Sequence, residues 1–186
     1  MENAREIPPD FPLATVLFIN ICNLEVPDNH ASPEPLNTLS LLFIIMNAII
    51  ESAGGLIQKV VCHTVGSSVL AYFGVLKGYT NDAERAITAA LAIREATATI
   101  QPAHIRMGLA RGAVFAAEVG ERRGRREFNI LGDTVNTAAR LMDFADVGQI
   151  VLTEAVARVS GQNQPPRPLG LCQLKGKTTP LPLFDL

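Results

Sequence analysis

One long apolar run constrains the fold of this chain more than any other segment. Residues 13–21 read Leu-Ala-Thr-Val-Leu-Phe-Ile-Asn-Ile, in which Thr15 and Asn20 are the polar residues. A half-exposed strand alternates apolar and polar side chains, whereas a strand covered on both faces is apolar almost throughout. The run therefore predicts a strand at the centre of a sheet.

Further apolar patterns divide the rest of the chain into alternating strands and helices. Gly54-Gly55 predicts the end of a long helix, and Asn81 or Thr80 is placed to cap the next one. Strands that alternate with helices, with hairpins among them, predict an α/β sandwich. We predict helices over about 36–52, 82–99, 154–160 and beyond residue 133, strands over 56–62, 68–73 and 149–153, a strand pair over 104–110 and 113–119, and a closing hairpin over 169–184.

Composition indicates one globular domain. The chain has 186 residues, of which 48% are apolar and 18% are charged, and its net charge is −2. This length suffices for one substantial core, and a small negative charge gives no general attraction to nucleic acid or to an anionic membrane. We interpret residues 1–11 as a tail or linker and residues 12–186 as the domain.

The cysteines and the N-terminus predict a cytoplasmic protein. Cys22, Cys62 and Cys172 have no metal-ligand spacing, so we expect reduced thiols. The polar, acidic N-terminus has no signal-peptide pattern. The apolar run 41–50 is ten residues long, whereas a bilayer-spanning helix needs about 20. This run therefore predicts a buried helix, whose second apolar side contacts either the same subunit or another one.

Residues 128–141 carry the clearest functional signal. They read Phe-Asn-Ile-Leu-Gly-Asp-Thr-Val-Asn-Thr-Ala-Ala-Arg-Leu, which predicts a strand, a turn and a helix that Asp133 or Thr134 caps. Asn136 and Arg140 are four residues apart and share one helix face. A guanidinium beside a carboxamide is suited to binding a phosphate oxygen and a hydroxyl, although an exposed polar helix face has the same pattern.

Several motifs occur together with that segment, in a fixed order. They are Thr15-Val-Leu-Phe-Ile-Asn-Ile21, Ala71-Tyr-Phe-Gly74, Asp82-Ala-Glu-Arg-Ala86, Gly112-Ala-Val-Phe-Ala-Ala-Glu-Val-Gly120 and Leu174-Lys-Gly-Lys177. Their order and spacing resemble the class III nucleotidyl cyclases, which close ATP or GTP into a cyclic 3′,5′-monophosphate. The resemblance implies an α/β sandwich with a ferredoxin-like βαββαβ core and extra strands. It also implies a dimer with its sites between the subunits.

The resemblance breaks down at the metal ligands. Class III cyclases use two divalent cations, Mg²⁺ or Mn²⁺, which two aspartates hold. Asn20 and Ser67 occupy those two positions here, and neither side chain carries a negative charge. We therefore expect no metal site on this chain alone, and interpret the two residues as a polar strand end and a turn residue.

The nucleotide-binding positions are better preserved. The resemblance implies that Asn136 orients the ribose, that Arg140 stabilises charge on the α-phosphate, and that Lys175 contacts the β- and γ-phosphates. His63 and Asn129 occupy the base-selecting positions, but neither is a familiar signature of adenine or guanine, so the purine is unassigned. Lys175 as an ordinary hairpin lysine and His63 as a strand histidine are the alternatives.

Four arginines follow Gly120: Arg122, Arg123, Arg125 and Arg126. The resemblance implies an arm that reaches toward the dimer partner, and a solvated basic turn is the alternative. The whole pattern predicts a cyclase half that acts with a metal-bearing partner half. A non-catalytic pseudo-cyclase that dimerises is the second hypothesis. An RNA-recognition module is disfavoured, because the strands lack its pattern of stacking aromatics.

Overall fold

The computed structural model describes residues 7–24, 34–63, 66–120, 126–160 and 165–186. Within these ranges the chain forms nine strands and four helices. In chain order they are β1 (Leu13–Cys22), α1 (Glu34–Ser52), β2 (Leu56–His63), β3 (Gly66–Phe73), α2 (Asp82–Thr97), β4 (His104–Ala113), β5 (Phe115–Gly120), β6 (Arg126–Leu131), α3 (Asp133–Phe144), β7 (Ile150–Thr153), α4 (Glu154–Ala157), β8 (Arg167–Cys172) and β9 (Leu181–Asp185).

The main sheet confirms the expected ferredoxin-like core. Its seven strands lie in the order β2-β3-β1-β4-β7-β9-β8. The elements from β1 to β4 follow the βαββαβ order, with β1 antiparallel to both β3 and β4. The added strand β7 is parallel to β4, and β9 and β8 extend the sheet beyond it. β1 is a central strand, as its apolar run predicts.

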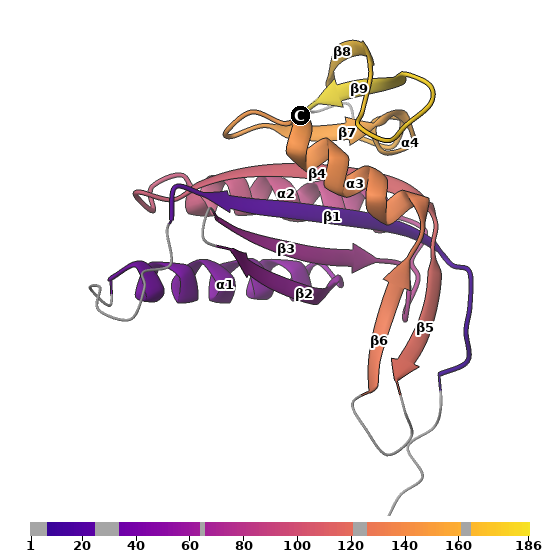
Figure 1. Cartoon of the computed structure of the whole chain (residues 1–186), viewed down its shortest axis with the longest axis horizontal. Helices are drawn as coiled ribbons and strands as arrows, with labels where there is room; N and C mark the ends of the chain where they lie inside the picture. Colours follow the sequence, from indigo (N-terminus) through magenta and orange to yellow (C-terminus); the bar gives the residue numbers. More distant parts are fainter. Residues whose placement is uncertain (1–6, 25–33, 64–65, 121–125, 161–164) are drawn as a thin grey trace, which may run out of the picture.

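Two hydrophobic cores lie on opposite faces of the sheet. Leu17, Ile19 and Ile21 of β1 pack with α1 and α2, whereas Ala14 and Val16 pack with α3. This alternation is the period of two that a strand imposes on its side chains. Figure 1 shows α1 and α2 behind the sheet and α3 in front of it. β1 is apolar on both faces because each face has a helical layer.

β5 and β6 form a separate two-stranded arm that projects away from the main sheet (Figure 1). The sequence predicts residues 104–110 and 113–119 as a strand pair, and this pairing is wrong. β4 ends at Ala113, the chain bends at Val114, and β5 pairs with β6 instead. The Val114 N–H donates to the carbonyl of Pro12, which diverts the backbone from the β4 direction. The arm is therefore joined to the core through this bend and through Gly132.

Neither predicted helix cap makes a side-chain capping bond, although Asn81 does occupy the predicted N-cap position. Asn81 is the N-cap residue of α2 but makes no side-chain cap bond, and the Asp82 carboxylate accepts from Tyr79 N–H instead, at 2.6 Å. For α3, Gly132 takes the N-cap position with a φ of 130°, and neither Asp133 nor Thr134 makes a capping bond. Both of these side chains bond to other elements, as described below. The predicted end of α1 is confirmed, since Gly55 N–H donates to the Ile50 carbonyl across Gly54.

Helix α1 is buried on one side by its own subunit, and its second apolar side is not covered by the described residues. It buries one stripe, formed by Leu39, Leu42, Met46 and Ile50, while Ile44 is 67% exposed. Its outer side and strand β2 line an open groove of about 540 Å³, and β2 is an edge strand of the sheet. The apolar run 41–50 belongs to a 19-residue helix, which meets the length and composition of a membrane span although core helices meet them too.

Candidate active site

Helix α3 lies directly on the main sheet. A Cβ built on Gly108 of β4 would lie 2.4 Å from both the Ala138 carbonyl oxygen and the Met142 nitrogen. The helix backbone therefore touches the strand, and a side chain at position 108 would push it away. Thr137, Ala138, Leu141 and Met142 form the buried side of α3.

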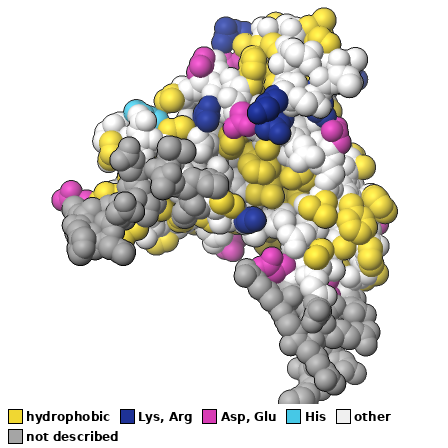
Figure 2. All heavy atoms as spheres, viewed as in Figure 1, with side chains coloured by type: hydrophobic (Ala, Val, Ile, Leu, Met, Phe, Trp, Pro, Cys, Tyr) yellow, Lys and Arg dark blue, Asp and Glu magenta, His cyan; other side chains and the backbone are white. Residues whose placement is uncertain are grey.

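Asn136 and Arg140 lie on the opposite, outward side of α3, as their spacing predicts. Asn136 is exposed, and the Arg140 side chain is 42% exposed, with its Nη1 3.6 Å from Asp143 Oδ2. A surface ion pair of this length is weak and can exchange for a stronger anion. Figure 2 shows Lys and Arg side chains bordering an apolar area on this face of the molecule. The site thus offers a carboxamide and a guanidinium to solvent from a fixed helix.

Asn20 lies at the end of β1 and its side chain is fully engaged. Its Nδ2 donates to the Ser67 carbonyl at 3.3 Å and lies 3.4 Å from Ser68 Oγ. Its Oδ1 accepts from Arg106 Nε at 3.1 Å and from the Cys22 thiol at 2.9 Å. Arg106 of β4 also donates from Nη1 to the Asp143 carbonyl at 3.2 Å. A guanidinium therefore lies against Asn20 and joins it to the last turn of α3.

Ser67 is near Asn20, but its side chain is buried. It is 1% exposed, and its Oγ has no hydrogen-bond partner among the described residues. Neighbouring strand residues point to opposite faces, and Val69, two positions on, packs in the α1–α2 core. Ser67 therefore shares the buried face of Val69, whereas Asn20 is on the face of Val16 and α3.

Lys175 lies in the loop between β8 and β9 and is exposed. The lysine two residues later makes the contact with α3: Lys177 Nζ lies 2.6 Å from both carboxylate oxygens of Asp133. Asp133 is the first residue of α3, and its neighbour Thr134 donates from Oγ1 to the Ala113 carbonyl at 2.8 Å. The start of α3 is thus tied to the end of β4 and to the loop that carries Lys175.

The two base-selecting positions are not joined by a described contact. Asn129 of β6 accepts through Oδ1 from Gln58 Nε2 at 2.9 Å and donates through Nδ2 to the Glu127 carbonyl at 3.3 Å. The Ile130 N–H donates to Gln58 Oε1 at 3.3 Å. Gln58 lies five residues before His63 on β2, about 16 Å away at the usual strand rise. The side chain of His63 lies outside the described part of the chain.

Most of the positively charged segment after Gly120 lies outside the described residues. Arg122, Arg123 and Arg125 lie outside the described residues, and Arg126 is described only as the first residue of β6. The expected arm toward a partner stays a prediction.

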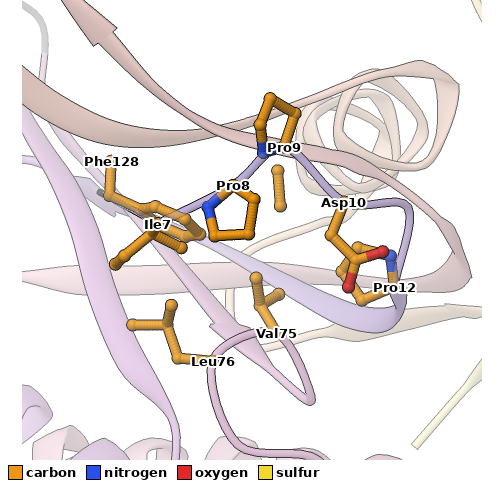
Figure 3. Close-up of a pocket in the computed structure, with 9 residues that line it drawn as sticks. Ile7, Pro8, Pro9, Asp10, Pro12, Val75, Leu76 and Phe128 are labelled. Atoms are coloured by element: carbon orange, nitrogen blue, oxygen red, sulfur yellow. The ribbon is translucent and has the colours of Figure 1, made fainter. Parts of the chain in front are cut away.

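A second cavity, of about 360 Å³, lies between the N-terminal segment, the start of β5 and the loop after β3 (Figure 3). Its lining is apolar apart from Asp10, whose backbone pairs with Ala116. A carboxylate without a cation beside it in this lining does not suit a phosphate, so the outward face of α3 is the better nucleotide site.

The described elements and their order match a known catalytic domain. The family model described as the adenylate and guanylate cyclase catalytic domain matches residues 8–181. The chain belongs to this family. The cyclase domain is 28% identical over 184 residues to adenylate cyclase 1 of Rhizobium meliloti, a match that covers 92% of this chain and 27% of that protein. It spans about a quarter of the length of such curated relatives.

Solved cyclase structures have the same fold. The adenylyl cyclase CyaB from P. aeruginosa matches with a TM-score of 0.86 and 23% identity, over 96% of this chain and 95% of that one. The guanylate cyclase domain of RhGC from Catenaria anguillulae, solved with GTP, matches with a TM-score of 0.82 and 25% identity, over 96% and 97%. The α+β sandwich of this cyclase domain is therefore the family fold.

The residues of this cyclase domain do not fit a two-cation site. The Asn20 oxygen already accepts from a guanidinium, and the Ser67 hydroxyl is buried. Within the described ranges, no group of three or more His, Cys, Asp or Glu side chains is arranged to hold a metal ion. A divalent cation beside Arg106 would be repelled by the positive charge of its guanidinium.

The sequence does not predict the part that three residues play in the site: Gln58, Arg106 and Lys177. Each contacts a residue distant in the chain, 71 positions away for Gln58, 86 for Arg106 and 44 for Lys177. Helix and strand periodicity report only on near neighbours, so no local pattern signals these contacts. The motif Leu174-Lys-Gly-Lys177 contains Lys177, but nothing in it indicates that Asp133 is the partner of this lysine.

Proposed function

We propose that this chain is the metal-free half of a nucleotidyl cyclase and acts in a dimer with an aspartate-bearing half. The observation that carries the proposal is the outward-facing pair Asn136 and Arg140 on a helix fixed to the sheet, beside an uncharged Asn20 whose oxygen accepts from Arg106. Divalent cations, which the family uses, would have to be held by the partner half.

The reaction forms one P–O bond and breaks another. The ribose 3′-oxygen of ATP or GTP bonds to the α-phosphorus, the bond from that phosphorus to the pyrophosphate oxygen breaks, and the hydroxyl proton leaves to solvent or a base. Asn136 orients the ribose by hydrogen bonding. Arg140 donates to the α-phosphate oxygens as their negative charge increases, and fixed donors of this kind lower the activation barrier by roughly 3 or 4 kcal/mol. Lys175 binds the β- and γ-phosphates.

Asn129 is proposed to contact the purine, whereas His63, about 16 Å along β2 from the Gln58 partner of Asn129, stays a prediction from the resemblance. The Ile130 N–H donates to Gln58 Oε1, so the Gln58 amide nitrogen faces Asn129. This nitrogen donates to Asn129 Oδ1 and thereby fixes the orientation of the Asn129 carboxamide. Asn129 retains one hydrogen-bond donor and one acceptor position, which is compatible with either purine.

The test is to mix the protein with a metal-competent class III cyclase half in Mn²⁺ and to assay ATP and GTP separately. We expect the mixture to cyclise nucleotide and the isolated protein to be inactive or nearly so. Arg140→Ala should lower kcat of the mixture by about 10²-fold or more. Arg158→Ala is the matched control, since Arg158 forms an exposed ion pair with Glu154 away from α3. Robust cyclisation by the isolated protein would contradict the proposal.

A non-catalytic dimerisation module is the second candidate. The engagement of Asn20 by Arg106 and of Asn129 by Gln58 favours it, because both side chains already have partners within the subunit. Full activity of an Arg140→Ala mixture would select this alternative.

A further inference from the structure

The loop between β8 and β9 carries two lysines with different surroundings. Lys175 is exposed, whereas the Lys177 side chain is only 18% exposed and lies against both oxygens of Asp133. We infer that Lys177 is a positioning residue, which holds the Lys175 loop at the start of α3 so that Lys175, Asn136 and Arg140 act on one nucleotide. This inference rests on the proposed function.

The loop is closed on itself. Lys177 N–H donates to the Leu174 carbonyl at 3.1 Å, Gln173 Nε2 donates to the Lys177 carbonyl, and Gly176 between them has a φ of 78°. Leu174 anchors one end, since it is buried in the core that contains Ala138 and Leu141 of α3. Lys175 follows that anchor directly, and Lys177 provides a second tie two residues on.

The other side of the contact is equally fixed. Asp133 opens α3, where the helix dipole favours a negative side chain. Thr134 ties the same turn to the Ala113 carbonyl, and Asn136 and Arg140 follow on the outward side. Lys177 therefore joins the two segments that carry the proposed phosphate and ribose contacts.

Because Asp133 is exposed, we expect the Lys177–Asp133 ion pair to affect the position of the loop more than the stability of the protein. The Asp133 side chain is 82% exposed, and ion pairs exposed to water contribute little to the free energy of unfolding. We therefore expect Lys177→Met to leave the melting temperature nearly unchanged while the Lys175 loop loses its tie to the start of α3.

Pyrophosphate inhibition of the mixed dimer tests this directly. Pyrophosphate occupies the β- and γ-phosphate positions, whereas the cyclic nucleotide product does not reach them. Lys177→Met should raise the inhibition constant of pyrophosphate roughly fivefold to tenfold, within the coupling range of contacting residues, and leave that of the cyclic product unchanged. Asp133→Asn should have the same effect. Arg167→Met is the matched control, because it breaks the Arg167–Asp185 ion pair between β8 and β9, the two strands that this loop connects.

A double-mutant comparison separates positioning from direct contact. If Lys177 acts through Lys175, Lys177→Met has no further effect on pyrophosphate inhibition in a Lys175→Ala background. Equal effects in both backgrounds, or no effect in either, would overturn the inference.

If the wild-type mixture is inactive, the proposed function is refuted, but the role of Lys177 in positioning the loop is not. Proteolysis then tests that role separately. Endoproteinase Lys-C should cut after Lys175 several times faster in Asp133→Asn than in the wild-type protein or Arg167→Met, measured by mass spectrometry of the fragment that ends at Lys175, because all three proteins keep both Lys175 and Lys177. An unchanged cleavage rate would refute the positioning role of Lys177.

Discussion

Arg106 is the residue that most alters the interpretation of this site. Its guanidinium lies against the Asn20 oxygen and bonds to the Asp143 carbonyl at the end of α3. The positive charge beside Asn20 therefore comes from a side chain of the same subunit. The strand end has become part of the scaffold that supports α3.

Replacing Arg106 should therefore be costly. We expect Arg106→Met to lower the free energy of unfolding by about 1.5–3 kcal/mol, because Asn20 and Asp143 each lose a charged donor. Urea denaturation measures the difference. Arg158→Met, at an exposed ion pair, should change stability by less than about 1 kcal/mol. Equal losses in the two variants would show that Arg106 contributes no more than a surface arginine.

Gln58 should matter for the attachment of the arm. Its carboxamide bonds to Asn129 and to the Ile130 N–H, which links β2 to β6. We expect Gln58→Met to lower the free energy of unfolding by about 1–2 kcal/mol and to speed hydrogen exchange at Ile130. Unchanged exchange at Ile130 would show that the arm is held without Gln58.

The sequence predicts the residues of the site better than their contacts. Helix periodicity predicts that Asn136 and Arg140 share one face of α3, and they do, while their roles in the site come from the family resemblance and stay a prediction. Asp133 and Thr134 have typical capping side chains, yet their bonds go to Lys177 and Ala113. A capping preference is worth about 1 kcal/mol, so tertiary partners can outweigh it.

At the scale of elements, the approach of α3 to β4 depends on one glycine. We expect Gly108→Ala to destabilise the protein by about 1–3 kcal/mol or more and to lower kcat of the mixed dimer, because the added Cβ meets helix backbone 2.4 Å away. Thermal unfolding and the cyclase assay measure the two effects.

Gly78→Ala is the control for this substitution. A Cβ at Gly78 would be 3.8 Å from its nearest neighbour, the Gly74 carbonyl oxygen, which is an ordinary contact distance. Similar losses in both variants would mean that close packing of α3 is not the cause.

The strands themselves were predictable, but their pairing was not always so. Apolar patterns locate β4 and β5 within a few residues of the expected ranges. The bend at Val114 depends on a carbonyl from Pro12, about 100 positions earlier in the chain, so adjacency in sequence favoured the wrong partner for β5. For α1 the sequence left two alternatives for its second apolar side, since an apolar helix does not reveal what covers each of its sides.

At the scale of the whole molecule, the proposed division of residues between two halves predicts a stoichiometry. When this protein is titrated into a fixed amount of the metal-bearing half, activity should rise and reach a plateau at one copy per partner. Each such heterodimer has one composite site, and further copies have no partner left to complete. Static light scattering identifies the species at the plateau. Activity that grows in proportion to this protein beyond that ratio would mean that it needs no partner.

The contact between Gly108 and α3 has one further consequence. At Gly108 the helix backbone lies so close to the strand that α3 cannot slide along β4 without meeting a larger side chain, so we expect strand and helix to move as one rigid body. Closure around a nucleotide would then be a rotation of one whole subunit against the other. A crosslink between the halves should arrest that rotation, whereas one between α3 and β4 should leave it free.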